Sequence, residues 1–304
     1  MKEVIVIGHK NPDTDSVVSA YVWSRLLSRL GDEAKPAVAG EVNKETKLVF
    51  ERAEVELPKK QNLEDRDIFL VDHNETGQMA GDPKNVIGVL DHHNLSDLST
   101  DQPIYFRNEP LGSTSSLIAR VASEKEVELE EEEIFLLLCG IISDTLKFNS
   151  PTTTDYDVNL ARDLADIIDV DIDKLAEEMF EAKSDLSDMT IKEVIEADYK
   201  DYEFGSKAVG VGVAEVATTS FFEDKEGEII EEMKKVKEEQ DLDHLFFGVI
   251  DILNKNTLLY VCDDQDQNLA KEVFDVTFEN VPVKLEGVAS RKKQIIPPLS
   301  KILK

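Results

Sequence analysis

The sequence predicts an α/β protein of two domains, in which an open, mainly parallel sheet flanked by helices precedes a smaller mixed α/β domain. The length of 304 residues exceeds the roughly 100–200 residues that one domain needs. Short, continuously apolar runs alternate with amphipathic stretches in the first half, which is typical of parallel strands buried on both faces. This pattern changes near residue 187. We therefore expect an N-terminal domain of residues 1–187 and a C-terminal domain of residues 188–304.

The N-terminal domain should alternate strands with helices, as βαβ units do. Strands are expected at Val4–Ile7, Ile68–Val71 and Val86–Leu90, the last interrupted by Gly88. Helices are expected at Ser16–Leu30, Ser113–Ser123, Glu131–Ile142, Asp155–Ile168 and Asp173–Ala182. Gly31 directly follows the first helix, as a glycine at a helix C-terminus does.

The C-terminal domain should follow the polar segment Lys183–Thr190. Helices are expected at Ile191–Ala197 and Phe222–Gln240, and strands at Ala208–Val216, Leu245–Leu253 and Thr257–Cys262. The run Asn254-Lys255-Asn256 predicts a turn that joins the last two strands as a hairpin.

The composition excludes several classes of protein. With 34 basic and 64 acidic residues the formal charge is −30, which argues against a nucleic-acid binder and against a partner of anionic membranes. Two cysteines cannot form a disulfide framework or a cysteine-rich zinc site. Met1 leads directly into a strand-like run, and the longest uncharged apolar stretch, Ile134–Ser143, is far shorter than the ~20 residues of a membrane span. We therefore expect a cytoplasmic protein.

Histidines and carboxylates gather where predicted strands end. The motifs are Gly8-His9-x-Asn11-Pro12-Asp13-x-Asp15, Asp72-His73-Asn74 and Asp91-His92-His93, and Asp144 ends a further apolar run. One such motif alone would fit a helix cap or a loop. Three at consecutive strand ends favour a shared site, because ligands of open α/β sheets bind beyond the carboxyl ends of the strands.

The side chains in these motifs indicate which metal could bind. Carboxylates and imidazoles without thiolates suit Mn²⁺ or a similar ion of near-octahedral geometry. Their number exceeds what one ion needs, which favours two ions that share a carboxylate. Such pairs, about 3.5–4 Å apart, are used for in-line displacement at phosphorus.

A charge count indicates where a polyanionic substrate would find further cations. Two divalent ions would be balanced by the four carboxylates Asp13, Asp15, Asp72 and Asp144. The stretch Lys284–Lys304 holds six basic residues against Glu286 alone, and Ser290-Arg291-Lys292-Lys293-Gln294 is its densest part. An exposed tail or turn is the alternative reading, but a clamp for oxyanions fits the scarcity of positive charge elsewhere.

Together these motifs resemble the DHH phosphoesterase superfamily. The closing Ser290-Arg291-Lys292-Lys293-Gln294 resembles the C-terminal domain of its family II, manganese-dependent inorganic pyrophosphatases. The order and spacing match over nearly the whole chain, without a regulatory CBS-type insertion. The resemblance implies a short form with a DHH-type catalytic domain and a DHHA2-type substrate-binding domain that closes over the site.

The resemblance also implies roles for individual residues. One ion would be held by His9, Asp13 and Asp72, and the other by Asp15, Asp72, His92 and Asp144. Substrate oxygens would be bound by His93, Lys200, Arg291 and Lys292. Lys200 rests on the short match Asp198-Tyr199-Lys200, and Lys207 lies nearby. His73 would support the site or be structural, and His244 has no assigned role.

The implied activity is hydrolysis of inorganic pyrophosphate to two orthophosphates by water or hydroxide activated by two metal ions. The ions would be Mn²⁺ or Co²⁺, with Mg²⁺ accompanying the substrate, and the enzyme would be a homodimer. Three alternatives remain open: a phosphodiesterase of short oligonucleotides or cyclic dinucleotides, a long-chain polyphosphatase, and a noncatalytic regulator that binds metal or phosphate.

Overall fold

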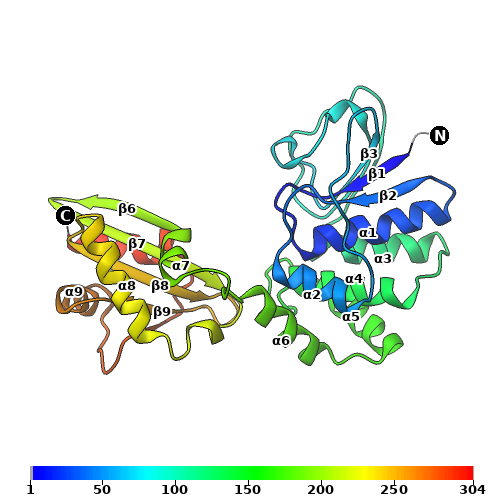
Figure 1. The fold of residues 1–304 in the computed structure, drawn as a ribbon. Coiled ribbons are helices and arrows are strands. Elements are labelled where there is room, and N and C mark those ends of the chain that lie inside the picture. The colour runs from blue at the N-terminus through cyan, green and yellow to red at the C-terminus, as the bar shows by residue number, and fades with distance from the viewer. Residues whose placement is uncertain (1–2, 304) are drawn as a thin grey trace. The chain divides into compact units, whose positions relative to one another are not determined.

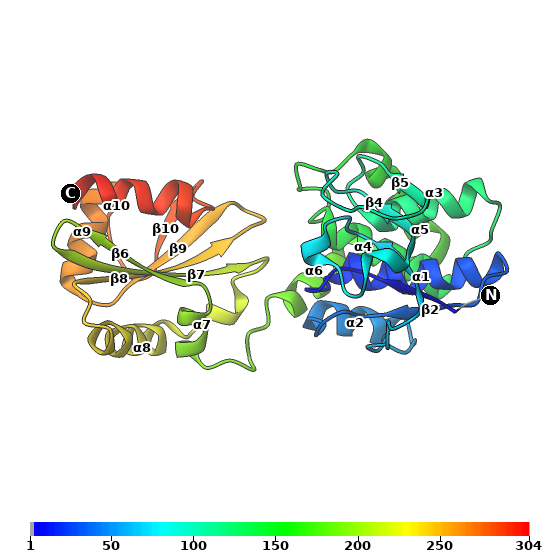
Figure 2. The same cartoon turned by 90° about the horizontal axis from the view of Figure 1, so that it is seen from above.

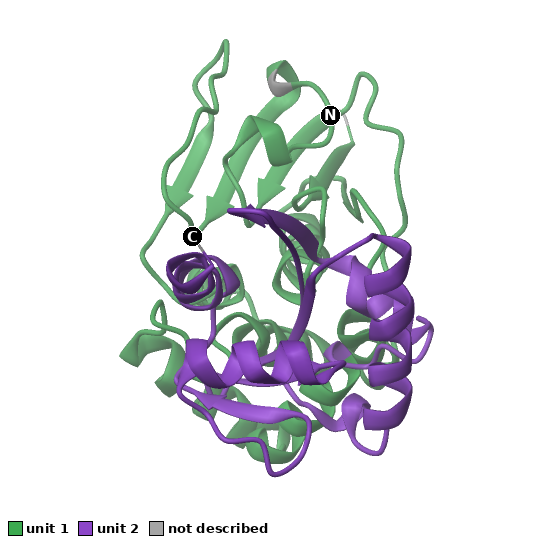
Figure 3. Ribbon diagram, turned by 90° about the vertical axis from the view of Figure 1, so that its left-hand side faces the viewer, with its two compact units in different colours: residues 1–182 green, residues 183–304 purple. Residues whose placement is uncertain are grey.

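A computed structural model describes residues 3–303 and divides into compact units of residues 1–182 and 183–304 (Figure 3). The division falls slightly earlier than the boundary expected near residue 187. Local bonding explains the difference, since the Ser184 hydroxyl accepts hydrogen bonds from the backbone N–H groups of Ala217 and Thr218. Leu186 also packs against the core of the second unit.

The first unit contains an all-parallel sheet of five strands (Figure 1). Its order is β2 (Ala34–Ala37), β1 (Val4–Ile7), β3 (Asp67–Val71), β4 (Val86–Asp91) and β5 (Tyr105–Asn108). The three predicted strands are confirmed as its central strands. The edge strands β2 and β5 were not predicted, because they lack a continuous apolar run. Pro36 in β2 has no N–H to donate, which an edge strand tolerates.

Gly88 interrupts the apolar run of β4 for a steric reason. A Cβ atom at this position would lie only 2.2 Å from the Phe69 ring on neighbouring β3. The missing side chain of Gly88 therefore makes room for a buried aromatic ring between the two strands.

Helices cover the sheet in layers. They are α1 (Thr14–Arg29), α2 (Lys44–Arg52), α3 (Thr114–Glu124), α4 (Glu131–Asp144), α5 (Asp155–Ile168) and α6 (Ile172–Lys183). The five predicted helices are confirmed, and α2 was missed. Two 3-10 turns, η1 (Thr76–Gln78) and η2 (Pro83–Asn85), lie between β3 and β4. Helices α1 and α3 pack on the sheet, and α4 packs against both (Figure 1).

The second unit contains a mixed sheet in the order β10 (Val283–Glu286), β9 (Asn256–Val261), β8 (His244–Asp251), β7 (Lys207–Val216) and β6 (Tyr199–Phe204). Only β7 and β8 pair in parallel. The predicted hairpin of β8 and β9 is confirmed. The strands β6 and β10 lie at the edges and were not predicted.

Helices pack on both faces of this sheet (Figure 2). One face carries α7 (Ile191–Ala197) and α8 (Glu226–Glu239), and the other carries α9 (Asp264–Phe274) and α10 (Ile296–Ile302). The predicted helix from Phe222 begins later, at Glu226, because Ser220–Phe222 forms a 3-10 turn, η3. A π-helical turn, η4 (Arg291–Ile295), leads into α10. Among the described residues, no helix combines the length and the apolar character that crossing a membrane requires.

A candidate dinuclear metal centre

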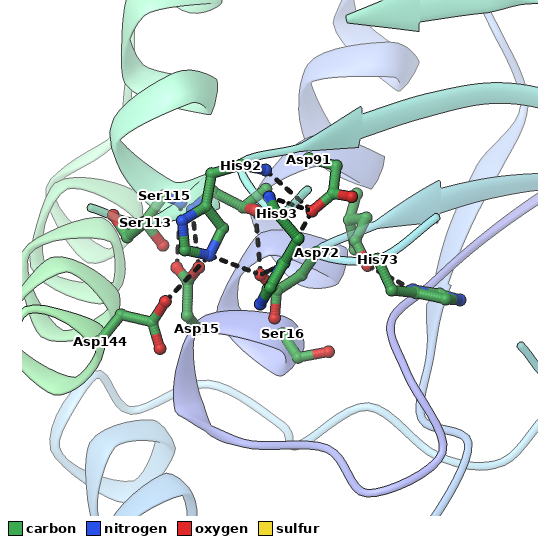
Figure 4. Close-up of polar contacts among 12 residues, drawn as sticks. Asp15, Ser16, Asp72, His73, Asp91, His92, His93, Ser113, Ser115 and Asp144 are labelled. Atoms are coloured by element: carbon green, nitrogen blue, oxygen red, sulfur yellow. Dashed lines mark hydrogen bonds and ion pairs between the residues drawn. The ribbon is translucent and has the colours of Figure 1, made fainter. Parts of the chain in front are cut away.

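The carboxyl ends of the parallel strands bring the predicted motifs of the first unit together (Figure 4). His9, Asp13 and Asp15 follow β1, Asp72 follows β3, and His92 and His93 follow β4, while Asp144 ends α4. These seven residues contribute to three overlapping groups of possible metal ligands, and Asp72 belongs to each group. The convergence matches the geometry expected of an open α/β sheet.

Asp72 lies at the centre of this cluster, with 1% of its surface exposed. Its Oδ2 atom is 3.3 Å from Nε2 of His9, and its Oδ1 atom is 3.3 Å from Nε2 of His92. The Thr114 hydroxyl also donates a hydrogen bond of 3.0 Å to Oδ1. Asp72 has a φ of 65°, a left-handed conformation that clusters at functional sites. Each carboxylate oxygen therefore faces a different histidine, as a bridging ligand requires.

The first ligand group consists of His9, Asp13 and Asp72. Nε2 of His9 is 3.5 Å from Oδ2 of Asp13. The other oxygen of Asp13 accepts a hydrogen bond of 3.0 Å from the backbone N–H of Ser16 and caps α1. Asp13 is thus the N-cap of α1, and its other oxygen faces the cluster.

The second ligand group consists of Asp15, Asp72, His92 and Asp144. Asp15 is fully buried, and its oxygens accept hydrogen bonds of 2.7 Å and 2.9 Å from the backbone N–H groups of Thr114 and Ser115. The N-terminus of α3 therefore fixes the orientation of this carboxylate. In the same group, Nε2 of His92 is 3.1 Å from Oδ2 of Asp144.

His92 provides the test of whether this group fits a metal ion. Its Nδ1 atom lies 3.0 Å from the Leu111 carbonyl oxygen, and a carbonyl can only accept, so Nδ1 donates. In the neutral ring Nε2 then carries a lone pair. This atom is buried and lies between the carboxylates of Asp72 and Asp144. A histidine fixed through Nδ1 to a backbone carbonyl is the usual arrangement of an imidazole metal ligand, and the oxygen and nitrogen donors suit Mn²⁺.

The carboxylates of the cluster favour positive charge on the neighbouring histidines. Burial lowers the pKa of His92, but Asp144 and Asp72 outweigh this effect and raise the pKa to about 12. Burial also opposes protonation of His9, yet Asp13 and Asp72 raise its pKa to about 10. Burial raises the pKa of Asp144 to about 6. Protons on the two imidazoles therefore supply the charge that a bound ion would otherwise provide.

We expect metal binding to release protons. At neutral pH both histidines hold an extra proton, and burial also raises the pKa of the Asp15 carboxyl, so Mn²⁺ binding should release about two or more protons per chain. The apparent affinity for Mn²⁺ should rise with pH through the alkaline range, because His9 keeps its extra proton up to a pKa of about 10 and His92 up to a pKa of about 12. Calorimetric titrations in buffers of different ionisation enthalpy measure this release. An affinity independent of pH between about 6 and 9 would contradict the protonated histidines.

His93 is oriented by Asp91. Nδ1 of His93 donates a hydrogen bond of 2.9 Å to the buried carboxylate of Asp91, which raises the pKa of His93. Asp91 also accepts from the backbone N–H groups of both histidines and from the side-chain amide of Asn74. No role was predicted for Asp91, although its place at the start of the Asp91-His92-His93 motif was a usable signal. The contact leaves Nε2 of His93 for another partner.

A cavity of about 440 Å³ opens beside the cluster. His9, Asp72 and His93 line one part of it, and the amide side chains of Asn11, Gln78 and Asn94 line another. His73 also lines this cavity and packs edge-on against His9, at a ring distance of 6.3 Å. Its Nδ1 atom donates to the Val71 carbonyl, and burial lowers the pKa of the ring, which favours its neutral form. The cavity therefore offers polar walls next to the ligand groups, and Glu75 is a further acidic residue among them.

Gly140 permits the close approach of α4 to Asp15. An added Cβ atom would lie 2.1 Å from Oγ of Ser115 and 2.8 Å from Oδ1 of Asp15. We expect Gly140→Ala to lower the free energy of unfolding by about 1–3 kcal/mol and to weaken Mn²⁺ binding by roughly 10-fold. Gly227→Ala in α8 is the matched control, because its added Cβ meets nothing within 4 Å. Thermal unfolding and Mn²⁺ titration of both variants provide the test, and equal behaviour would refute the steric argument.

The remaining predicted site residues lie in the second unit. The Arg291 side chain, 10% exposed, donates to the backbone carbonyls of Asp198 and Val211, and its Nη2 atom is 2.6 Å from Oδ1 of Asp198. Val211 is the partner of Lys200 in the pairing of β6 with β7, so Arg291 reaches the part of the sheet that carries Lys200. Lys292 is exposed on the following turn. Asp198 is a further partner that sequence reasoning did not identify.

Lys207 and His244 of the second unit are bonded to carboxylates of the protein. Lys207 forms an ion pair of 2.6 Å with Asp243, whereas Lys200 is exposed. His244 is buried, and its Nδ1 atom contacts the fully buried carboxylate of Asp266 at 2.9 Å. Lys237 and Cys262 donate to the same carboxylate. His244 therefore belongs to a satisfied interior network, and Lys200 is the better candidate of the two lysines for a substrate.

Comparison with known proteins identifies the family. Residues 3–141 match the DHH family, N-terminal domain, and residues 177–302 match the DHHA2 domain. A relative from Bacillus licheniformis, named a manganese-dependent inorganic pyrophosphatase, is 37% identical over 100% of both chains. The chain belongs to the manganese-dependent inorganic pyrophosphatases. A relative of the same name from Bacillus anthracis is 38% identical over 99% of this chain and 98% of its own.

A solved structure supports the same family. A Methanococcus jannaschii protein assigned to family II of the inorganic pyrophosphatases is 34% identical and covers 99% of both chains, with a TM-score of 0.64. The resemblance of the motifs, the two-domain α/β fold and the enzyme family expected from the sequence are thereby confirmed for this pyrophosphatase family member.

Proposed function

We propose that this protein hydrolyses inorganic pyrophosphate to two orthophosphates at a centre of two Mn²⁺ ions. The observation that carries the proposal is the position of Asp72, whose two oxygens face His9 and His92 in two separate ligand groups. The names of the relatives, which span the full length of the chain, support the substrate and the metal. His9, Asp13 and Asp72 would hold one ion, and Asp15, Asp72, His92 and Asp144 would hold the other.

The bound ions would supply Lewis-acid activation of water and a clamp for phosphoryl oxygens. The protein residues would bind and orient the substrate. Because Asp91 holds Nδ1 of His93, Nε2 can donate a proton or a hydrogen bond to a phosphoryl oxygen in the cavity. The amides of Asn11, Gln78 and Asn94 can donate to further oxygens. A pyrophosphate would thus be oriented by imidazole and amide donors on one side and by the ligand groups on the other.

Lys200, Arg291 and Lys292 would supply positive charge to the phosphoryl oxygens in addition to that of the metal ions. We expect the second unit to close over the substrate and bring these side chains to the phosphoryl oxygens, while excluding bulk water. Asp198 supports this role, because it holds the guanidinium of Arg291 in one orientation and reduces the entropy that would be lost on binding. Co²⁺ could replace Mn²⁺, and Mg²⁺ would accompany the substrate, since it dehydrates reluctantly. The homodimer and the cytoplasmic location remain predictions.

The proposed substrate is tested by a metal-dependent assay of hydrolysis. Pyrophosphate, a dinucleotide such as pGpG and long-chain polyphosphate are compared at equal concentrations with Mn²⁺, Co²⁺ or Mg²⁺. We expect pyrophosphate with Mn²⁺ or Co²⁺ to be turned over fastest, with two phosphates formed per molecule. Preference for the dinucleotide or for polyphosphate would replace the proposal with one of those activities. No turnover of any of them, with metal bound, would favour the noncatalytic regulator.

A further inference from the structure

We infer that Glu45 is a positioning residue for the metal centre, an inference that rests on the proposed function. Glu45 lies in the first turn of α2, and its carboxylate is fully buried. Its Oε2 atom accepts a hydrogen bond of 2.7 Å from the Thr14 hydroxyl and one of 2.8 Å from the Ser143 hydroxyl. A single buried oxygen therefore connects α2 with the beginning of α1 and the end of α4.

The two hydroxyls belong to sequence neighbours of the proposed ligands. Thr14 stands between Asp13 and Asp15, and Ser143 directly precedes Asp144. Thr14 and Ser143 are themselves buried. The contact with Glu45 consequently fixes the backbone at the start of α1, beside Asp15, and at the end of α4, beside Asp144. These are the two carboxylates that only the second ligand group contains.

The direction of the hydrogen bonds strengthens this link. Thr14 has one hydroxyl proton, which it donates to Glu45, so it can only accept at the 3.0 Å contact with Thr46. Thr46 therefore donates to Thr14, which donates to Glu45, which also accepts from Ser143. The backbone N–H of Thr46 in turn donates to Asn43, the N-cap of α2. The first turn of α2 is thus bonded to both helices that carry Asp15 and Asp144 (Figure 1).

The buried carboxylate of Glu45 needs hydrogen-bond partners in the protein. Removing a charged group from water is costly unless its oxygens are hydrogen-bonded, and the hydroxyls of Thr14 and Ser143 satisfy part of that requirement. The position near the N-terminus of α2 favours the negative charge as well. Removing a residue that supports and orients the ligands of a metal ion typically weakens metal binding by about 10–100-fold. We expect Glu45 to act mainly on the ion held by Asp15 and Asp144.

The test is Mn²⁺ titration of the full chain by calorimetry, with pyrophosphate hydrolysis and thermal unfolding of the metal-free protein measured alongside. Glu45→Ala should weaken one of the two Mn²⁺-binding events by about 10–100-fold and leave the other nearly unchanged. Glu45→Gln keeps an acceptor oxygen for the hydroxyls and should restore most of the affinity. Ser143→Ala removes one donor and should show an intermediate loss. Glu51→Ala removes an exposed carboxylate from the same helix and should match the parent.

Several results would overturn the inference. They are retention of both affinities by a folded Glu45→Ala variant, equal weakening of both ions together with a lower melting temperature, or a Glu45→Gln variant as weak as Glu45→Ala. If Glu45→Ala does not fold, Ser143→Ala decides, and unchanged binding in that variant refutes the role of Glu45. A parent protein that binds no Mn²⁺ would refute the proposed function itself. If the parent binds two ions and hydrolyses pyrophosphate but the variants are unaffected, the role of Glu45 is refuted and the proposed function is not.

Discussion

Replacing Asp72 with alanine should abolish pyrophosphate hydrolysis and loosen both manganese ions. Asp72 is the residue shared by all three possible ligand groups of the centre, and its oxygens face His9 and His92 at 3.3 Å each. A bridging carboxylate cannot be replaced by either neighbour, because their oxygens serve one group each. We expect kcat/KM to fall by at least about 1000-fold, which corresponds to roughly 4 kcal/mol.

A second variant is needed because alanine is strained in the backbone conformation of Asp72. Its φ of 65° is tolerated by asparagine but costs alanine roughly 1–2 kcal/mol. Asp72→Asn therefore removes the charge while keeping the backbone conformation, and it should also lose both ions. Glu64→Ala, which removes an exposed carboxylate ahead of β3, is the control. Metal analysis after gel filtration is the measurement, and two tightly bound ions in either Asp72 variant would rule out the bridging role.

Replacing Arg291 or Lys292 with alanine should impair catalysis while leaving both metal ions bound. All proposed ligands lie in the first unit, whereas these cations lie in the second. Loss of one charge-assisted contact to a phosphoryl oxygen should cost about 2–4 kcal/mol, or roughly 30- to 1000-fold in kcat/KM. Arg291→Lys should remain impaired, because an ammonium cannot reproduce the fork that Asp198 holds in place.

Steady-state kinetics at saturating metal measure this effect. Lys301→Ala is the matched control, since it removes an exposed charge from the same unit, in α10. A cationic turn that is merely solvated would leave Arg291→Ala and Lys292→Ala within about threefold of the parent, with at most a change in salt dependence. That outcome would refute the clamp but not the metal centre.

The central strands and the ligand motifs were predictable because burial and chemistry leave clear patterns in the sequence. The strands β1, β3 and β4 are buried on both faces, and such strands read as continuous apolar runs. The motifs that follow them had to converge because parallel strands end at one edge of the sheet. Edge strands such as β2 and β5 carry polar or exposed residues and give no such pattern.

Residues that hold other site residues in position could not be predicted in the same way. Glu45 stands in a short helix whose sequence, Lys44–Arg52, reads as a solvated surface, and only the packing of α2 shows that its carboxylate is buried. Asp198 likewise gave no local signal, because Arg291, the residue bonded to it, is distant in the sequence. Both contacts depend on tertiary packing between segments far apart in the chain, about which local sequence patterns carry no information.

The central claim is that two manganese ions share the Asp72 carboxylate. Anomalous diffraction at the manganese absorption edge, from crystals of the full chain grown with Mn²⁺, tests it most directly. We expect two peaks about 3.5–4 Å apart, one beside His9 and Asp13 and the other beside His92, Asp15 and Asp144, with Asp72 between them. A single peak in this cluster, or two peaks that do not both contact Asp72, would contradict the account.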